Sequence, residues 1–102
     1  MDSDNSITAL FSSHDLMAIG AYEAVFNRGL SVPDDISIVG HDNIRISSLV
    51  RPKLTTINTF KKNLGEAAVD LLMREMQGLG GVSLEEVFRT ELVERESVCM
   101  RR

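Results

Sequence analysis

Two short polar clusters hold the residues best suited to chemistry or to ligand recognition. The first runs from Ser12 to Asp15 and the second from His41 to Asn43. Each directly follows an apolar run rich in strand formers, Ile7–Phe11 and Ile36–Gly40. Their carboxylates, imidazoles and amide can donate or accept hydrogen bonds. Together they would suit the hydroxyls or ring nitrogens of a small polar molecule.

The elements around the clusters predict that they lie side by side. Leu16–Arg28 has the pattern of a helix, and Gly29 stands at the usual left-handed position after it. Ile7–Gly40 therefore predicts strand, helix and strand, with both strands buried and parallel and the crossover right-handed. Adjacent strands lie roughly 4.8 Å apart, and ligands bind beyond the carboxyl ends of parallel strands. We expect the two clusters to form one site.

Five residues of these clusters are candidate ligand contacts, and each also has a plainer interpretation. They are Asp42, His14, Asp15, Asn43 and His41. Asp15 can instead cap the helix, and Asp42 and Asn43 can stabilise a turn. His14 can be a surface residue and His41 a packing residue. Asp42 is favoured because it follows a buried strand at the crevice.

Catalytic chemistry is not expected. The chain has no phosphate-binding glycine loop, no HExxH helix and no nucleophile-elbow motif. Nothing marks a base for Ser12 or Ser13, and Cys99, the only cysteine, has no positioned partner. The two His-Asp pairs resemble zinc ligands, but alternate residues at a strand end face opposite sides. We expect no metal and no cofactor, and a metal-dependent hydrolase is the enzyme alternative.

The rest of the chain completes an α/β pattern. Ile44–Val50 predicts a short helix or turn, and Leu54–Thr59 an extended segment. Lys61–Gln77 predicts an amphipathic helix, with apolar residues on one stripe. Val87–Val93 predicts a last strand and Arg95–Arg102 a polar tail.

Size and charge limit the classes of protein to consider. The chain of 102 residues suits one small domain. Its net charge of −4 argues against binding a nucleic-acid backbone on its own. There is no apolar run near roughly 18 residues, the length of a membrane span, and no secretion signal in residues 1–15. A cytoplasmic protein is expected.

The first predicted helix has an unusual surface. Between Leu16 and Phe26 the only charged residue is Glu23. A helix this apolar is expected to be covered on more than one side. One face can pack on a sheet, and the other would suit a partner surface.

Several ordered segments of the chain resemble LacI/GalR-type transcription regulators. They are Thr8–Ala21, similar to TAIFAANDLMALGA; Arg28–Asn43, similar to RGLRVPEDVSVVGFDD; Pro52–Ile57, similar to PPLTTI; Leu64–Ala68 in the next helix; and Glu91–Ser97, similar to ELVVRES. The resemblance covers nearly the whole chain. One such segment is a weak signal, whereas all of them in order are specific.

This resemblance implies a partial copy of the parallel-sheet, periplasmic-binding-protein-like (type I) sensor fold, built from βαβ units. Residues 1–6 would be a disordered lead-in, 7–97 the C-terminal part of the effector-binding domain, and 98–102 a tail. The family's helix-turn-helix DNA-binding header is absent from this chain. The implied function is effector sensing and dimerisation in a transcription repressor, not an enzyme activity. A fragment of a periplasmic sugar-binding transport receptor is the alternative.

The resemblance also assigns roles to the candidate contacts. Asp42 matches the family's effector-contacting aspartate. His14 stands where the family usually has asparagine, also an effector contact, and His41 replaces a usual Phe or Tyr. These departures alter the pocket, although an imidazole can still donate and accept hydrogen bonds. The effector implied by the resemblance is a small polar molecule, either a sugar or purine-like.

A homodimer is implied as well. The residues that match subunit-pairing regions are Leu16, Ile19, Glu23, Phe26 and Val50. Operator DNA would be bound only through the missing header. The family layout places residues 7–51 in one lobe and 61–93 in the other, so a lone copy would leave sheet edges and apolar faces uncovered. We expect a fragment that dimerises or exchanges elements.

Overall fold

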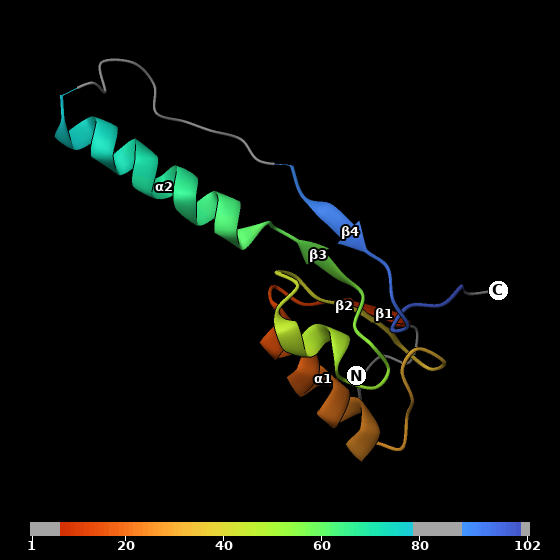
Figure 1. Cartoon of the computed structure of the whole chain (residues 1–102). Coiled ribbons are helices and arrows are strands. Elements are labelled where there is room, and N and C mark those ends of the chain that lie inside the picture. Colours follow the sequence, from red (N-terminus) through yellow and green to blue (C-terminus); the bar gives the residue numbers. More distant parts are fainter. Residues whose placement is uncertain (1–6, 79–88, 101–102) are drawn as a thin grey trace.

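The computed structural model describes residues 7–78 and 89–100 (Figure 1). In chain order the elements are β1 (Ala9–Phe11), α1 (Asp15–Asn27), β2 (Ser37–Val39), the 3-10 helix η1 (Arg45–Ser48), β3 (Thr56–Asn58), α2 (Lys61–Met76) and β4 (Glu91–Val93). This order confirms the predicted α/β succession. The expected lead-in, residues 1–6, and the first two residues of the expected last strand lie outside the described residues.

Parallel pairing of β1 and β2 confirms the predicted βαβ unit. Leu10 lies opposite Ile38 in this pair, and α1 connects the two strands. The sheet continues where Val39 forms a parallel bridge with Thr55, just before β3. β3 then pairs in the antiparallel sense with β4. The carboxyl ends of β1 and β2 thus lie on one side, as the predicted site requires.

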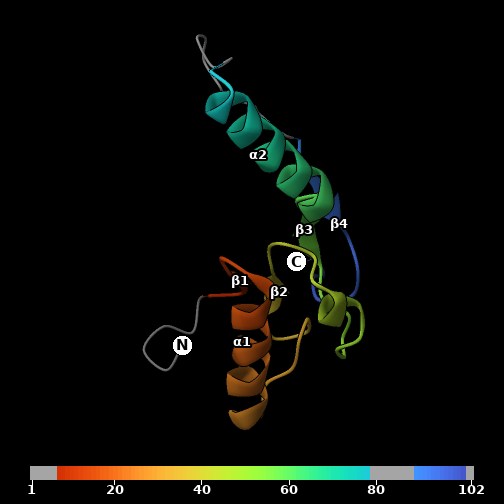
Figure 2. The ribbon, with the colours of Figure 1, turned by 60° about the vertical axis from the view of Figure 1, so that its left-hand side comes forward.

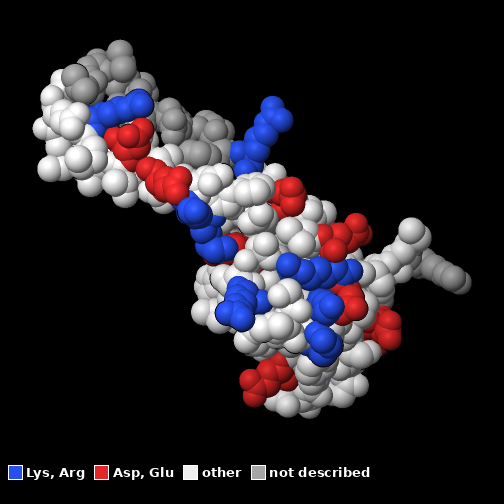
Figure 3. Space-filling model, in the orientation of Figure 1, with Lys and Arg blue, Asp and Glu red and all other residues white. Residues whose placement is uncertain are grey.

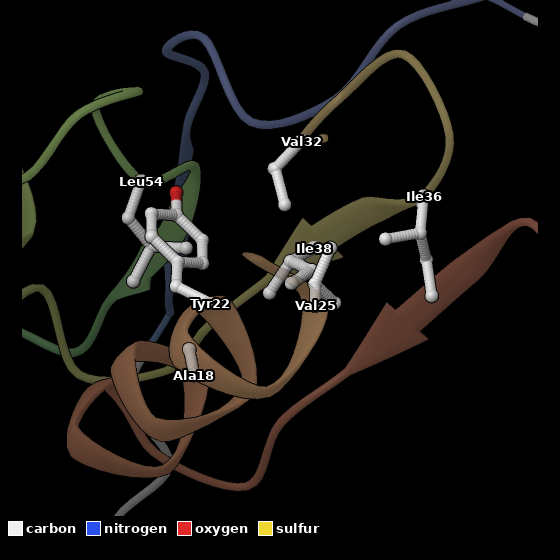
Figure 4. Packing of buried hydrophobic residues seen from close by; sticks show 7 residues of the cluster. All are labelled: Ala18, Tyr22, Val25, Val32, Ile36, Ile38 and Leu54. Atoms are coloured by element: carbon white, nitrogen blue, oxygen red, sulfur yellow. The ribbon is translucent and has the colours of Figure 1, made fainter. Parts of the chain in front are cut away.

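The core lies between α1 and this sheet (Figure 4). Its buried apolar residues are Ala18, Tyr22, Val25, Val32, Ile36, Ile38 and Leu54. The three from α1 are spaced four and three residues apart, which places them on one face of the helix. Tyr22 donates its hydroxyl to the carbonyl of Pro52 at 2.9 Å, so its polar end has a partner.

The prediction that the first strand is buried is wrong. All three residues of β1 are exposed, including Leu10 and Phe11, which is 61% exposed. Among the described residues β1 pairs with β2 alone, so it is an edge strand. The apolar run specifies extended backbone, but burial also needs neighbours on both faces, and the described residues do not supply them.

The predicted polar tail, residues 95–102, is attached to the sheet at Ser97 and Cys99. Ser97 is fully buried. Its carbonyl accepts from the amide of Ile38 at 2.9 Å, and its hydroxyl accepts from the amide of Thr55 at 2.9 Å. The amide of Cys99 donates to the hydroxyl of Ser37 at 3.2 Å. Polar groups of this segment thus bond to the sheet.

The second helix leads away from the α1–sheet body as an arm (Figures 1 and 2). The chain measures 58 × 27 × 24 Å along its principal axes. No residue of α2 is buried, and Leu72 and Met76 of its predicted apolar stripe are largely exposed. This agrees with the expectation that apolar faces are left uncovered. No helix within residues 7–78 and 89–100 is long and apolar enough to cross a membrane.

Candidate functional site

The ends of β1 and β2 are hydrogen-bonded to each other. The amide of Ser12 donates to the carbonyl of Val39 at 2.8 Å, and the amide of Asp15 donates to the carbonyl of His41 at 3.0 Å. The two polar clusters therefore meet, as the topology predicted. The candidate site is the edge of the sheet where they meet.

A tight loop presents the second cluster. Asp42 and Asn43 have φ angles of 104° and 52°, in the left-handed region that Asp and Asn tolerate better than most residues. The Asp42 side chain is 40% exposed, and its Oδ1 lies 3.2 Å from Nδ1 of His41, which is 35% exposed. The loop thus keeps a carboxylate and an imidazole side by side and open to a ligand.

Successive backbone amides of this loop are held by fixed acceptors. The amide of Asp42 donates to the Ile57 carbonyl at 2.9 Å. The amide of Asn43 donates to Oγ1 of Thr56 at 3.2 Å, and that of Ile44 to Oδ2 of the Asp15 carboxylate at 2.8 Å. Left-handed backbone at a residue other than glycine costs about 1–3 kcal/mol and persists where its surroundings over-determine it. These bonds supply that constraint.

Asp15 holds the site together from inside. It is fully buried, and its Oδ1 accepts the hydroxyl of Thr56 at 2.6 Å while Oδ2 accepts the Ile44 amide. The interpretation of Asp15 as the helix cap is wrong, because α1 is capped by His14, whose Nδ1 accepts from the amide of Met17 at 3.4 Å. With both oxygens bonded inside the protein, Asp15 positions the loop and has no surface open to a ligand.

Asn43 likewise points its amide oxygen into the protein. Its Oδ1 accepts from Nη2 of Arg95 at 2.8 Å and from the Ser47 hydroxyl at 3.2 Å. Arg95 also donates to the Leu54 carbonyl at 2.8 Å. The oxygen proposed to contact a ligand is thus part of an internal network. Sequence reasoning missed Arg95, although it lies within a segment that resembles a family motif.

Gly40 is another residue of the site that the sequence interpretation treated only as a strand end. A Cβ at this position would lie 2.1 Å from Oδ1 of Asp15 and 2.9 Å from Cδ2 of Leu54. Real Cβ atoms do not approach so closely, so only glycine fits beside the buried carboxylate. A glycine between an apolar run and a polar cluster is the signal by which this close approach could have been predicted.

The two histidines stand on neighbouring strand ends. His14 is exposed at the start of α1, and His41 is half-buried beside Asp42. Within the described ranges no three His, Cys, Asp or Glu residues come together in a way that could hold a metal ion. The imidazole and carboxylate groups of these residues can donate and accept hydrogen bonds.

A shallow groove of about 390 Å³ lies between α1 and residues 50–51. It is lined by Ile19, Tyr22, Glu23, Phe26, Asn27, Val50 and Arg51. Four of the five predicted subunit-pairing residues lie in this lining, and the fifth, Leu16, is 66% exposed on the same helix.

Burial raises the pKa of Tyr22 to about 12, a shift that the hydrogen bond with Ser97 opposes and the charge of Glu96 reinforces.

Comparison with known proteins identifies relatives along nearly the whole chain. A family model described as a periplasmic binding protein-like domain matches residues 3–98. The "HTH-type transcriptional repressor PurR" of Histophilus somni is 44% identical over 96 residues, which are 93% of this chain and 28% of that protein. Among solved structures, the Lac repressor dimer bound to operator and the anti-inducer ONPF has a TM-score of 0.82 and 36% identity, covering 91% of this chain and 32% of the other.

A second solved structure is a LacI family transcriptional regulator from Enterococcus faecium with bound ribose. It has a TM-score of 0.84 and 32% identity over 94% of this chain and 36% of its own. The chain spans less than a third of the length of its first curated relatives. These relatives are named transcriptional repressors, which favours the regulator over the transport receptor and over an enzyme.

Proposed function

The chain belongs to the periplasmic binding protein-like family, among the LacI-family regulators, and on that basis we propose that it senses a small polar effector for a dimeric transcription regulator. The single observation that carries the proposal is the meeting of the two polar clusters at the ends of β1 and β2. Ligands of open parallel sheets bind at this edge.

Within the proposal, Asp42, His14 and His41 contact the effector. Asp42 and His41 are accessible and adjacent, and His14 stands on the neighbouring strand end. A carboxylate accepts hydrogen bonds from hydroxyls or ring N–H groups, and an imidazole can donate or accept. Sugars and purine bases both carry such groups. A LacI family relative with bound ribose supports the sugar class.

Asp15 and Asn43 have a supporting role in this proposal. Their side chains fix the loop through Thr56, Ile44 and Arg95 instead of facing the ligand. A pre-formed loop lowers the cost of ordering the contact residues when the effector binds. The predicted site is thus divided into three contact residues and two that position them.

The outer face of α1 is the proposed dimer surface. Leu16 and Phe26 are exposed, whereas the opposite face of the same helix is buried in the core. Apolar side chains in a shallow groove suit a second copy, because covering them removes apolar surface from water. The Lac repressor relative, described as a dimer, supports this arrangement. Effector binding would then act by favouring one arrangement of the dimer.

The proposal does not assign operator binding to the described residues; it assigns it only to the regulator as a whole. Acidic and basic side chains are interleaved on the face of the described residues in Figure 3, which shows no broad basic field. Binding of a phosphate backbone needs such a field. The proposal places the protein in the cytoplasm, where a regulator meets DNA.

Isothermal titration calorimetry tests the sensing proposal. The chain is titrated with D-ribose and with adenine, alongside the variants Asp42→Asn and Asp70→Asn. Asp70 is an exposed aspartate on α2, paired with Arg74 at 3.3 Å, so it controls for loss of a surface carboxylate. We expect binding of one probe class, at least tenfold weaker in Asp42→Asn and unchanged in Asp70→Asn. Equal affinity in the two variants would remove Asp42 from the site.

Sedimentation equilibrium tests the dimer surface. We expect Phe26→Glu to shift the chain towards monomer, because a charge in the groove must be desolvated on pairing. Leu72→Glu, on the exposed arm, is the matched control and should leave the dimer intact. A wild-type monomer at all concentrations would contradict the dimer surface.

A further inference from the structure

The lysine that begins α2 reaches back to the loop that presents Asp42. The ammonium group of Lys61 donates to the carbonyl oxygen of Asp42, and it lies 3.3 Å from the carbonyl oxygen of Asn43. Both carbonyls belong to the left-handed part of the loop, at φ angles of 104° and 52°. One flexible cation thus holds two consecutive peptide groups from outside, opposite the amides that the protein interior holds.

Helix stability does not explain a lysine at this position. The N-terminal end of a helix carries partial positive charge, so a cation there is unfavourable. The first turn of α2 has no acidic residue, and its N-cap, Phe60, makes no side-chain capping bond. Lys62 is also exposed on the same turn. Lys61 differs in its bonds to the loop.

The two carbonyls share peptide groups with the next amides along the chain. The Asp42 carbonyl belongs to the same peptide group as the amide of Asn43, and the Asn43 carbonyl to that of Ile44. Those amides donate to Thr56 and Asp15, respectively. Each of these peptide groups is therefore held at both ends. Releasing the carbonyl end lets the group rotate and weakens the bond at its amide end.

We propose that Lys61 is a positioning residue of the effector site, which fixes the loop that carries Asp42 by clasping the carbonyls of Asp42 and Asn43. The inference rests on the proposed function in that Asp42 contacts the effector. It adds a residue from α2, outside both polar clusters, and joins the loop to the base of the arm. Loss of the clasp should loosen the loop without weakening the helix.

Amide hydrogen exchange by NMR tests the clasp without any ligand, on wild type, Lys61→Met, Lys61→Arg and Lys62→Met. A hydrogen bond of ordinary net strength is worth a factor of roughly 2 to 10. We expect exchange at the Asn43 and Ile44 amides to rise about three- to tenfold in Lys61→Met. It should stay near wild type in Lys62→Met and return most of the way in Lys61→Arg, whose guanidinium can also donate to both carbonyls.

A melting curve separates positioning from general stability. Removal of a cation from the N-terminal end of α2 should leave the melting temperature unchanged or slightly higher, although the loop exchanges faster. Equal exchange in Lys61→Met and Lys62→Met would overturn the proposal. Faster exchange accompanied by a lower melting temperature and by faster exchange throughout the core would also overturn it.

Titration of the same four proteins with D-ribose and adenine connects the clasp to binding. We expect the affinity for the bound probe to fall about three- to tenfold in Lys61→Met alone, because the loop must be ordered on binding. If no protein, including wild type, binds either probe, the effector classes of the proposed function fail. The exchange data then still show whether Lys61 fixes the loop. If wild type binds and Lys61→Met binds equally well, the positioning role is refuted.

Discussion

Replacing Asp15 with alanine should be among the most damaging single changes in the site. It leaves the Ile44 amide without its acceptor and deprives the Thr56 hydroxyl of its own. A hydrogen bond to a charged group contributes about 1.5–3 kcal/mol, and an unsatisfied buried donor costs about 1–3 kcal/mol. The Thr56 hydroxyl can turn to another acceptor, so we expect the free energy of unfolding to fall by about 3–4 kcal/mol.

Thermal unfolding followed by far-ultraviolet circular dichroism measures this loss. For a chain of about 100 residues, 1 kcal/mol lowers the melting temperature by roughly 4–8 °C, so Asp15→Ala should melt about 12–30 °C lower. Asp15→Asn should lose less, since its amide can still accept from Ile44 and can donate to Thr56.

The matched control is Asp35→Ala. Asp35 also accepts two hydrogen bonds with one carboxylate oxygen, from the amide and the hydroxyl of Ser31 at 2.8 and 3.1 Å, but it is exposed. Water replaces these bonds, so the loss should stay below about 1 kcal/mol. Similar losses in Asp15→Ala and Asp35→Ala would refute the argument that burial makes the Asp15 bonds indispensable.

Three further predictions follow from the same packing. Gly40→Ala should destabilise the chain by at least about 2 kcal/mol in urea unfolding, because its Cβ meets the Asp15 carboxylate; Gly20→Ala, with open space, should be neutral or stabilising. The single tyrosine, Tyr22, should ionise near pH 12 by phenolate absorbance. The pKa of Tyr22 in the folded chain lies above the ordinary value near 10. The stability that this residue contributes is therefore present below about pH 10 and lost as pH rises towards 12. An ionisation midpoint near pH 10 in the folded protein would contradict the burial of Tyr22. Arg95→Met should raise amide exchange at the loop and lower the melting temperature, because Arg95 joins the loop to the sheet; wild-type exchange would contradict that link.

The sequence predicted the local elements well because each is specified by neighbours in the chain. The α1 helix ends where Gly29 was expected to end it, with a φ of 74°. The strand at Ser37–Val39 and the helix at Lys61–Met76 lie within the predicted ranges. Strand–helix–strand order then brought the two clusters together, since the crossover rule leaves little choice.

Burial and the detailed roles of polar residues were harder to predict because they depend on distant contacts. Phe11 is exposed since nothing in the described chain covers it. Ser97 is buried since it bonds to Thr55 and Ile38, which lie 42 and 59 residues earlier in the chain. Asp15 turns inward to meet Thr56, 41 residues away. A single sequence shows the type of such residues but not the partner that decides their role.

NMR mapping of a bound probe tests the sensing proposal most directly. The chain, labelled with nitrogen-15, is titrated with D-ribose and then with adenine while the backbone amides are recorded. We predict saturable shifts for one probe, centred on residues 12–15 and 41–44, with little change along α2 beyond its first turn. Saturable shifts centred elsewhere, or none with either probe in a folded chain, would contradict the assignment of the effector site to the ends of β1 and β2.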